Sequence, residues 1–441
     1  MSVFAIRIYH GRPDVAQTPE DPLSIKRLTP LIAVGLLTVA LATACSSSDS
    51  DSGGPASTDS SSVLGAPKAA TGTPVSVGFI SEGKGAAIDN TNEIQTAKAA
   101  AAYVNEYLGG IGGHPITLEV CETRADTATA ISCANQLVEK KVVAVLAGAL
   151  ADDASSHKVV TQAGIPFVIA SGGSAEVLDS TDLTYAFMAS PVTTLAAPAA
   201  YAKANDIKSV GAVIIQVPTV TGQWEDLGKP LYSAAGLDLV TTPIAPGTPD
   251  MTPQIQSLIR DNPEMVQVIG NASFCLSAFQ GLQTLGYSGK ISSIPQCVDE
   301  TVVDTLGDSL DGQLVTSTTS LDPDEASYQL YKTVADKYQP GTDLGGSATT
   351  GFVSVLGFAR ALESGGLAGD VTNESVNTAM KASKDVDLPL GAGIKFTCSA
   401  RPIAILPAVC SPNTLVGTLT AEGVVSDPEI VDSQPLFAAI G

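Results

Sequence analysis

Basic residues are scarce in this sequence. The 441 residues include 23 Lys and Arg against 45 Asp and Glu, which gives a formal net charge of -22. A field of this sign repels polyanions, and no cluster of Lys or Arg offers a surface that could follow a phosphate backbone. The composition therefore argues against nucleic acid as a partner.

Metal-binding patterns are also missing. The chain has 3 histidines and no CxxC spacing, and only His114 and His157 follow the export signal described below. These are too few nitrogen ligands for a His-based zinc site, so we expect no metal. His114 follows a GG turn and His157 falls within a predicted helix, and we expect both at the surface.

The usual catalytic motifs are absent, because the chain contains neither GxSxG nor HExxH. The stretch 78–85, GFISEGKG, resembles a phosphate-binding P-loop. Its first three residues continue a strand, however, and Gly85 stands where Ser or Thr must bind Mg²⁺. A dinucleotide fingerprint fails because Ile88 takes its third glycine position. We expect no enzyme and no cofactor, with an exported enzyme as the weaker alternative.

Long apolar runs are lacking after Pro74, where none reaches the ~20 residues that a membrane-spanning helix needs. A sensor domain within a spanning receptor is therefore disfavoured. A ligand-sensing protein that acts on a separate membrane receptor stays open. What the chain does have is 44% hydrophobic and 15% charged residues, a composition typical of a well-packed protein, with a length that favours two domains.

An export signal precedes this globular part. Two basic residues come before the apolar run 31–44, LIAVGLLTVALATA, which has about the length of a signal-peptide core. The run ends directly before Cys45 in a pattern that resembles the lipobox of bacterial lipoproteins, with Ala42 where Leu is commoner. We expect residues 1–44 to be a signal peptide and Cys45 to carry lipid. The alternative is an ordinary secreted protein cut nearby.

The segment after Cys45 is rich in Ser, Gly and Asp, SSSDSDSGGPASTDSSS. It is too polar to bury a core and therefore predicts a lipid-anchored, flexible tether over residues 45–72. Several acyl chains on one cysteine would hold the protein at the outer face of the bacterial cell membrane.

Six cysteines remain, an even number in an oxidising compartment, which predicts three disulfides. Other pairings are possible in principle. The economical choice joins neighbours in sequence: Cys121 with Cys133, Cys275 with Cys297, and Cys398 with Cys410.

From Pro74 onward, short apolar runs alternate with longer Ala-rich stretches, which predicts βαβ units and parallel sheets. In the first lobe we expect strands at 75–80, 116–120, 142–148 and 166–171, with helices at 90–108, 127–139 and 151–162. In the second we expect a helix ending at Asn205, strands at 209–217, 237–244, 265–270, 290–294 and 312–318, and helices at 225–235 and 274–285.

Three further helices, at 325–338, 347–364 and 374–382, follow without strands between them, so they should pack back onto one lobe. Short strands around GIKF and TLVGTL then close the chain.

The order of these elements resembles a known family. Together with GGIGGHPITLEV at 109–120 and AGIPFVIASGGSAEV at 163–177, it is similar to the periplasmic ligand-binding proteins of the branched-chain amino acid ABC transporter family. The resemblance implies an α/β fold of the periplasmic binding protein type I. Two Rossmann-like lobes with parallel sheets are joined by a multi-strand hinge.

The resemblance also implies a domain division and a function. Lobe 1 would comprise residues 73–194 and 322–386, and lobe 2 residues 195–321 and 387–441. A small polar solute such as an amino acid, an amide or a related organic acid would be captured by hinge closure and passed to an ABC permease.

Open α/β sheets bind ligands at the carboxyl ends of their strands, so the loops there hold the candidate contacts. After the first strand these are Ser81 and Glu82, with Lys84 as a further candidate; single loop charges can also be solvated. The family pattern adds further first-lobe residues: Leu150, Ala151, Asp152, Ser171, Gly172, Gly173 and Ser174. Their backbone N–H groups and hydroxyls suit a carboxylate or carbonyl, unless SGGS is simply a turn with an N-cap.

The second lobe would contribute Gln216, Thr221, Trp224, Asn271, Ser273, Gln296 and Asp299. Thr221 and Ser273 stand near positions where the amino-acid binders place tyrosines, and Gln296 or Asp299 stands near their acid, so an amino-acid ligand is in question. Trp224 is either an aromatic wall for the ligand or a core residue.

Overall fold

The computed structural model describes residues 60–85, 88–421 and 423–441, all of which belong to one compact unit. The predicted signal peptide, Cys45 and the first part of the predicted tether lie outside the described residues. No helix in the described part of the chain is both long and apolar enough to span a membrane.

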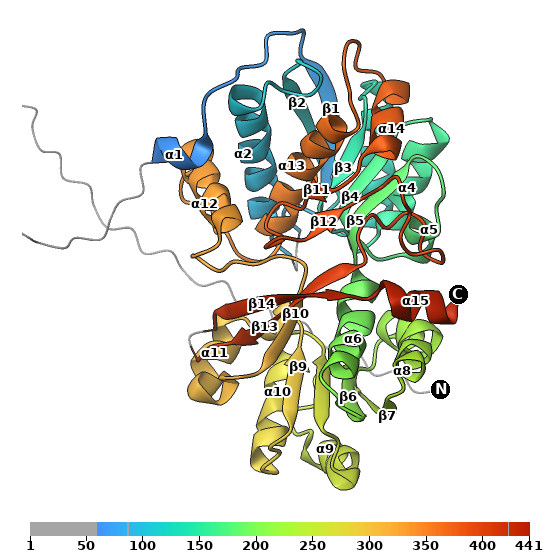
Figure 1. Ribbon diagram of the computed structural model, residues 1–441, viewed down its shortest axis with the longest axis vertical. Helices are drawn as coiled ribbons and strands as arrows, with labels where there is room; N and C mark the ends of the chain where they lie inside the picture. Colours follow the sequence, from blue (N-terminus) through green and yellow to red (C-terminus); the bar gives the residue numbers. More distant parts are fainter. Residues whose placement is uncertain (1–59, 86–87, 422) are drawn as a thin grey trace, which may run out of the picture. The chain divides into compact units, whose positions relative to one another are not determined.

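The first lobe is built on a five-stranded parallel sheet in the order β2-β1-β3-β4-β5 (Figure 1). Its strands are β1 (Val75–Ser81), β2 (Ile116–Glu122), β3 (Val145–Ala147), β4 (Phe167–Gly172) and β5 (Thr184–Ala189). In β1, Val77 and Phe79 pack on one face of the sheet and Ile80 packs on the other. Sheets covered on both faces need nearly continuous apolar strands, which is why β1, β3 and β4 are visible in the sequence.

Helices cover both faces of this sheet. One face carries α3 (Thr127–Glu139) and α4 (Asp153–Gln162), and the other carries α2 (Thr91–Tyr107), α12 (Ala326–Tyr338), α13 (Ala348–Ser364) and α14 (Asn373–Ala382). The short α5 (Ala175–Leu178) joins β4 to β5. The three late helices therefore return to the first lobe, as a group.

The second lobe has a seven-stranded sheet in the order β14-β13-β10-β9-β8-β6-β7. Five strands run parallel: β6 (Ser209–Ile215), β7 (Asp238–Ile244), β8 (Met265–Ile269), β9 (Lys290–Ser293) and β10 (Leu314–Ser317). The last two, β13 (Asn413–Leu419) and β14 (Val425–Asp432), are antiparallel and form one edge.

The helices of the second lobe include two π-helical turns. One, Val192–Ala196, leads into α6 (Ala197–Ala204), and the other, Trp224–Gly228, joins α7 (Pro218–Gln223) to α8 (Lys229–Ala235). The others are α9 (Thr252–Leu258), α10 (Ala272–Thr284), α11 (Glu300–Leu306) and α15 (Gln434–Ile440), with 3-10 turns at Ile259–Asp261, Pro295–Cys297 and Gly307–Leu310. The strands β5 and β14 and the helices α9, α11 and α15 have no counterpart among the sequence predictions.

The chain passes between the lobes after β5, again between β10 and α12, and finally after Cys410. Before that last passage, β11 (Val386–Asp387) pairs with β12 (Lys395–Phe396), and the ring centroid of Phe396 lies 4.6 Å from that of Phe187. The Cys410 N–H then donates to the carbonyl of Ala186 in β5 at 2.8 Å. Phe396 and Cys410 thus contact lobe 1, while the Ile405 side chain lies beside Gly441 at the end of the chain. The division of the chain into residues 73–194 with 322–386 and 195–321 with 387–441 stays a prediction.

Part of the predicted tether is attached to lobe 1. Residues Ser60–Leu64 form the short helix α1, in which Leu64 is buried, and the Tyr103 hydroxyl donates to the Leu64 carbonyl at 3.4 Å. Further along, the Ala70 N–H donates to the Asn105 carbonyl at 2.8 Å. The expectation of a free segment up to residue 72 is therefore wrong for its last part, because a buried leucine and backbone hydrogen bonds hold it.

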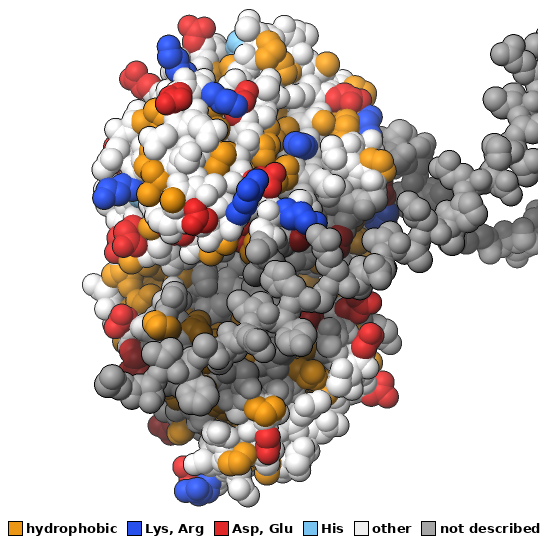
Figure 2. Space-filling model, turned by 180° about the vertical axis from the view of Figure 1, so that it is seen from behind, with side chains coloured by type: hydrophobic (Ala, Val, Ile, Leu, Met, Phe, Trp, Pro, Cys, Tyr) orange, Lys and Arg blue, Asp and Glu red, His pale blue; other side chains and the backbone are white. Residues whose placement is uncertain are grey.

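All three predicted disulfides are present. Cys121–Cys133 links β2 to α3, and Cys275–Cys297 links α10 to the turn after β9. Cys398–Cys410 closes the segment that returns to the first lobe. On the face shown in Figure 2, acidic and basic side chains are interspersed on the visible part of the upper lobe.

Candidate functional site

The carboxyl ends of the parallel strands in the two lobes point toward each other (Figure 1). A direct contact joins these edges: the Gln223 side-chain amide, from α7 after β6, donates to the Gly173 carbonyl, after β4, at 3.2 Å. The loops at these edges hold the candidate residues. The geometry that parallel sheets impose therefore gathers the predicted positions along two opposed edges.

Glu93, in the first turn of α2, is the most deeply placed acid at the first-lobe edge, with 0% of its surface exposed. One carboxylate oxygen accepts from the Ala149 N–H at 3.1 Å and from the Thr350 hydroxyl at 2.8 Å. The other accepts from the Ser81 hydroxyl. Burial raises the pKa of Glu93 to about 7, although these three donors favour the ionised form.

Close approach of backbone to this carboxylate depends on Gly148, at the end of β3. A Cβ at residue 148 would collide with the Glu93 carboxylate. Sequence reasoning missed Glu93 as a site residue. A signal was available, because Glu93 shares a helical face with Ala97, Ala100 and Val104, which are buried, and an acid on an apolar face needs partners.

Glu82 was a candidate contact, with a solvated position as the alternative. It is 4% exposed, and its two oxygens accept from the Ala151 N–H at 2.8 Å and from the Asn90 side chain at 3.2 Å. Lys84 behaves differently, since it is exposed and pairs with Asp89 at 2.7 Å. The carboxylate therefore turns inward and the neighbouring ammonium group turns to solvent.

A third buried acid, Asp153, holds the SGGS loop. Its Oδ2 accepts from the Gly173 N–H at 2.9 Å and from the Ser174 N–H at 3.3 Å, and the residue is 2% exposed. The Ser174 hydroxyl caps α5 by accepting from the Val177 N–H. The loop is thus a capped turn, and these N–H groups do not stand free as expected for a carboxylate site.

The remaining first-lobe candidates fall into two groups. Asp152 caps α4 and also accepts from the Thr127 hydroxyl at 2.6 Å, while Leu150 packs against the core. Ser171 and Gly172 end β4, and within the described residues the partly exposed Ser171 hydroxyl has no hydrogen-bond partner. Ser171 is therefore the first-lobe candidate whose hydroxyl is available.

In the second lobe, Trp224 lies in the core. Its side chain is fully buried, its indole N–H donates to the Thr241 hydroxyl at 2.8 Å, and its ring lies 5.6 Å from that of Tyr232. Trp224 is therefore placed as a core residue, and its ring has no exposed face that could contact a ligand. Thr221 turns back into its own helix, where its hydroxyl donates to the Val217 carbonyl at 3.0 Å.

The other second-lobe candidates sit at the tips of their strands. Asn271 caps α10 and also accepts from the Ser273 hydroxyl, and Asp299 caps α11. Gln216 and Gln296 are exposed, and neither side chain has a hydrogen-bond partner in the described part of the chain. Contact between any of these residues and a solute remains a prediction.

The two histidines lie away from these edges. The His114 Nδ1–H donates to the Thr73 carbonyl at 2.7 Å, next to the GG turn. His157 was expected at the surface but is 8% exposed, with Nε2 2.8 Å from the Thr184 hydroxyl, because α4 packs on the sheet. Burial lowers its pKa. Among the described residues, no group of three or more His, Cys, Asp or Glu could hold a metal.

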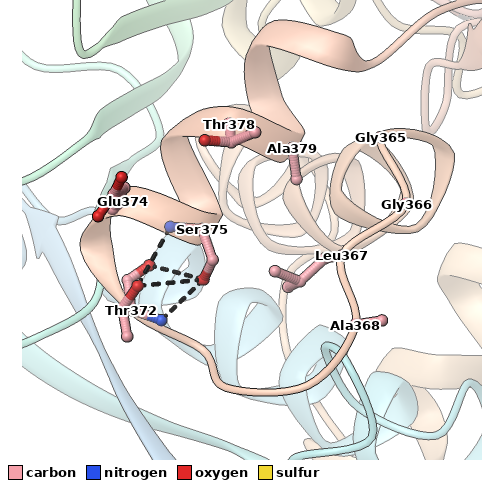
Figure 3. A pocket seen from close by; sticks show the side chains of 9 residues that line it. All are labelled: Gly365, Gly366, Leu367, Ala368, Thr372, Glu374, Ser375, Thr378 and Ala379. Atoms are coloured by element: carbon pink, nitrogen blue, oxygen red, sulfur yellow. Dashed lines mark hydrogen bonds between the residues drawn. The ribbon is translucent and has the colours of Figure 1, made fainter.

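Two surface hollows occur elsewhere. One, of about 360 Å³, lies between the end of α13 and the start of α14 (Figure 3). There Ser375 and Thr372 bond to each other in a reciprocal capping box. The other, of about 500 Å³, lies beside α8 at the start of β7. Neither hollow adjoins the carboxyl ends of the strands.

Comparison with known proteins agrees with this architecture. The family model described as periplasmic binding protein matches residues 74–407. A solved structure of the branched-chain amino acid transporter substrate-binding protein LivJ from Streptococcus pneumoniae, in complex with isoleucine, is 17% identical. It covers 82% of this chain and 100% of its own, with a TM-score of 0.61.

Two further solved structures are similar. The leucine-binding protein LivK from Thermotoga maritima is 15% identical, covers 81% of this chain and 99% of its own, and has a TM-score of 0.62. The fatty acid ABC transporter substrate-binding protein from Thermomonospora curvata is 15% identical, covers 83% and 93%, and has a TM-score of 0.63. No curated protein matches the sequence significantly. At these identities the likeness establishes the fold, which confirms the predicted two-lobed α/β architecture.

Proposed function

Because the chain belongs to the periplasmic binding protein family, we propose that it is an extracytoplasmic solute-binding lipoprotein of an ABC importer. It captures a small polar solute between its lobes and delivers it to a permease of the branched-chain amino acid type. The carrying observation is the pair of opposed strand edges, bridged by the contact from Gln223 to Gly173. Structural relatives described as binding isoleucine, leucine or fatty acids support a small-molecule solute.

Binding works through hinge closure. The solute contacts both lobes only when they approach, so its differential affinity shifts the population toward the closed form. The passages after β5, after β10 and after Cys410 are where the backbone must bend. Proposed contacts come from the first-lobe positions Ser81, Glu82, Leu150 to Asp152 and Ser171 to Ser174, and from the second-lobe positions Gln216, Thr221, Asn271, Ser273, Gln296 and Asp299.

Native mass spectrometry of protein purified without unfolding tests this function. We expect a bound small molecule that is released unchanged on denaturation, and a thermal shift when the same compound is returned to stripped protein. Chemical conversion of the compound would favour the alternative of an exported enzyme. Binding without any effect on uptake in a permease-containing strain would favour the alternative of a sensor for a separate receptor.

The membrane anchor is tested separately. Cys45 is the proposed lipidation site, on the strength of the preceding signal-like sequence. Wild-type protein should partition with the membrane fraction, and the variant Cys45→Ser should appear in the culture medium or the periplasm. Equal partitioning of both proteins would exclude the lipid anchor without affecting the solute-binding proposal.

A further inference from the structure

Several N–H groups of the first-lobe loops already have acceptors from the protein itself. Four, from Ala149, Ala151, Gly173 and Ser174, lie in the loops after β3 and β4. They donate to carboxylates at 3.1, 2.8, 2.9 and 3.3 Å respectively. These are the donors that a solute carboxylate would need at this edge.

The acceptors are three different acids brought from three elements. Glu93 comes from α2, Glu82 follows β1, and Asp153 opens α4, and their exposed fractions are 0%, 4% and 2%. A solute carboxylate could reach the loop amides only by displacing these side chains. Each displaced buried carboxylate would then lose its donors, which is costly in a site that excludes water.

The charged residues at the strand ends also disfavour a solute carboxylate. The loops that follow the carboxyl ends of β1 to β4 and β6 to β9 contain acids at six positions: Glu82, Asp89, Asp126, Asp152, Asp250 and Asp299. They contain two basic residues, Lys84 and Arg124. Lys84 and Asp89 neutralise each other, and Arg124 is exposed, as are Asp126, Asp250 and Asp299, so solvent screens these charges. Glu82 is the buried acid of this set and is screened least.

We infer, on the basis of the proposed solute-binding function, that the first-lobe wall takes the hydrogen-bond-donating end of a solute. That end is a protonated amine or a neutral N–H or O–H group, and a free carboxylate is excluded there. The side chains left to meet it can accept hydrogen bonds: the Glu82 carboxylate through its unused lone pairs, and the Ser171 hydroxyl, which can also donate. This narrows the range of amino acids, amides and organic acids that the fold alone permits.

Matched solutes test the inference on the full-length protein. The probes are alkylamines, the primary amides of equal chain length, and the carboxylates of equal chain length, each titrated into stripped protein by calorimetry and thermal shift. We expect amines or amides to bind at least about tenfold more tightly than the carboxylates of the same skeleton. A solute carboxylate would meet the negative charge of Glu82 at a wall where four loop N–H groups are already bonded to protein carboxylates.

Two substitutions probe the charge of the wall directly. Glu82→Gln and Asp153→Asn keep an oxygen acceptor for the loop amides but remove one negative charge each. Each variant should weaken amine binding and strengthen carboxylate binding. The ratio of the carboxylate Kd to the amine Kd should therefore fall by about three- to tenfold. Asp206→Asn is the matched control, since Asp206 is exposed in the turn before β6, at the amino end of the second-lobe sheet.

The outcomes separate the two proposals. Carboxylates that bind as tightly as amines, in protein that still binds solutes, would overturn the inference and leave the proposed function standing. Absence of binding by all three probe classes, together with no solute in natively purified protein, would overturn the proposed function and the inference with it. An unchanged ratio in both Glu82→Gln and Asp153→Asn, with midpoints of thermal unfolding close to wild type, would also overturn the inference.

Discussion

The two strand edges that face each other are built differently. At the first-lobe edge, Glu82, Glu93 and Asp153 are buried and tie the loops to the sheet through main-chain N–H groups. At the second-lobe edge, Gln216 and Gln296 are exposed, without side-chain partners in the described residues. One wall is therefore fixed before a solute arrives, whereas the other keeps side chains free to adapt.

Replacing Glu93, the most deeply buried acid at the first-lobe edge, should lower the free energy of unfolding the most. Glu93→Ala leaves the Ser81 and Thr350 hydroxyls and the Ala149 N–H without their acceptor. We expect the free energy of unfolding to fall by about 3–5 kcal/mol, measured by urea denaturation. Asp299→Ala, which removes an exposed helix cap at the adaptable edge, should cost about 1 kcal/mol. Equal losses would contradict the contrast between the walls.

Stability should also depend on pH through Glu93. Burial raises the pKa of Glu93 from its ordinary value of 4.5 to about 7 in the folded protein, so the native state holds this proton more tightly than the unfolded chain. The stability that this bound proton gives to the folded state is fully present below about pH 4.5 and is lost as the pH rises through about 7. Relative to Glu93→Gln, the wild type should lose roughly 3 kcal/mol across this window.

Urea titrations of both proteins at several pH values check this difference. The common carboxylates cancel in the comparison because Glu93→Gln alters one group only. Parallel pH profiles for the two proteins would show that Glu93 is not the residue responsible.

A loss of stability of similar size is expected at the wall of the second lobe. Replacing Cys275 and Cys297 with Ser removes the bridge between α10 and the turn after β9. The chain-entropy treatment of disulfides gives a loss of about 3 kcal/mol in unfolding free energy. Affinity for the solute should fall more than in the double variant of Cys121 and Cys133, which lies at the outer edge of lobe 1.

Calorimetric titration of the two disulfide variants with the same solute provides the measurement. Equal affinities in both variants, at equal loss of stability, would show that the second-lobe bridge does not shape the binding wall.

The smallest expected effect comes from removing the hydrogen bond between Gln223 and Gly173, which joins the two walls. Gln223→Ala removes the hydrogen bond from the Gln223 amide to the Gly173 carbonyl, 3.2 Å long. Loss of one neutral hydrogen bond, about 1 kcal/mol, should move the population toward the open form by about fivefold. Small-angle scattering or single-molecule distance measurements on solute-free protein would detect the shift. Gln339→Ala, a change distant from the strand ends, should leave the distribution unchanged.

Much of the fold could be predicted from the sequence because its signals are local. The strands β1 and β4 are largely apolar runs bounded by glycine, proline or polar residues, β2 alternates apolar with polar residues, and α3 ends where its Ala-rich pattern ends. The strand β14 escaped prediction, because VSDPEIVD alternates acids with a proline and lacks an apolar face. The disulfides were predictable because each pair is close in sequence.

The site was less predictable because its contacts are long-range. Glu93 meets Thr350 across a separation of 257 residues, and nothing in the local pattern shows that pairing. Of the adjacent acids Asp152 and Asp153, no local feature marks the second as the buried one. The position of Trp224 likewise followed from packing against Tyr232 rather than from its place at a helix start.

The docking of α1 on the first lobe shortens the segment that would connect the protein to the proposed lipid on Cys45. Because Leu64 is buried and the Ala70 N–H is bonded to the Asn105 carbonyl, the stretch between Cys45 and Ser60 sets how far the body can stand from a lipid on Cys45. Roughly 15 residues can reach at most about 50 Å, about half of what a chain running to residue 72 could cover. The proposed lipid would therefore be joined to the molecule through lobe 1, which α1 contacts.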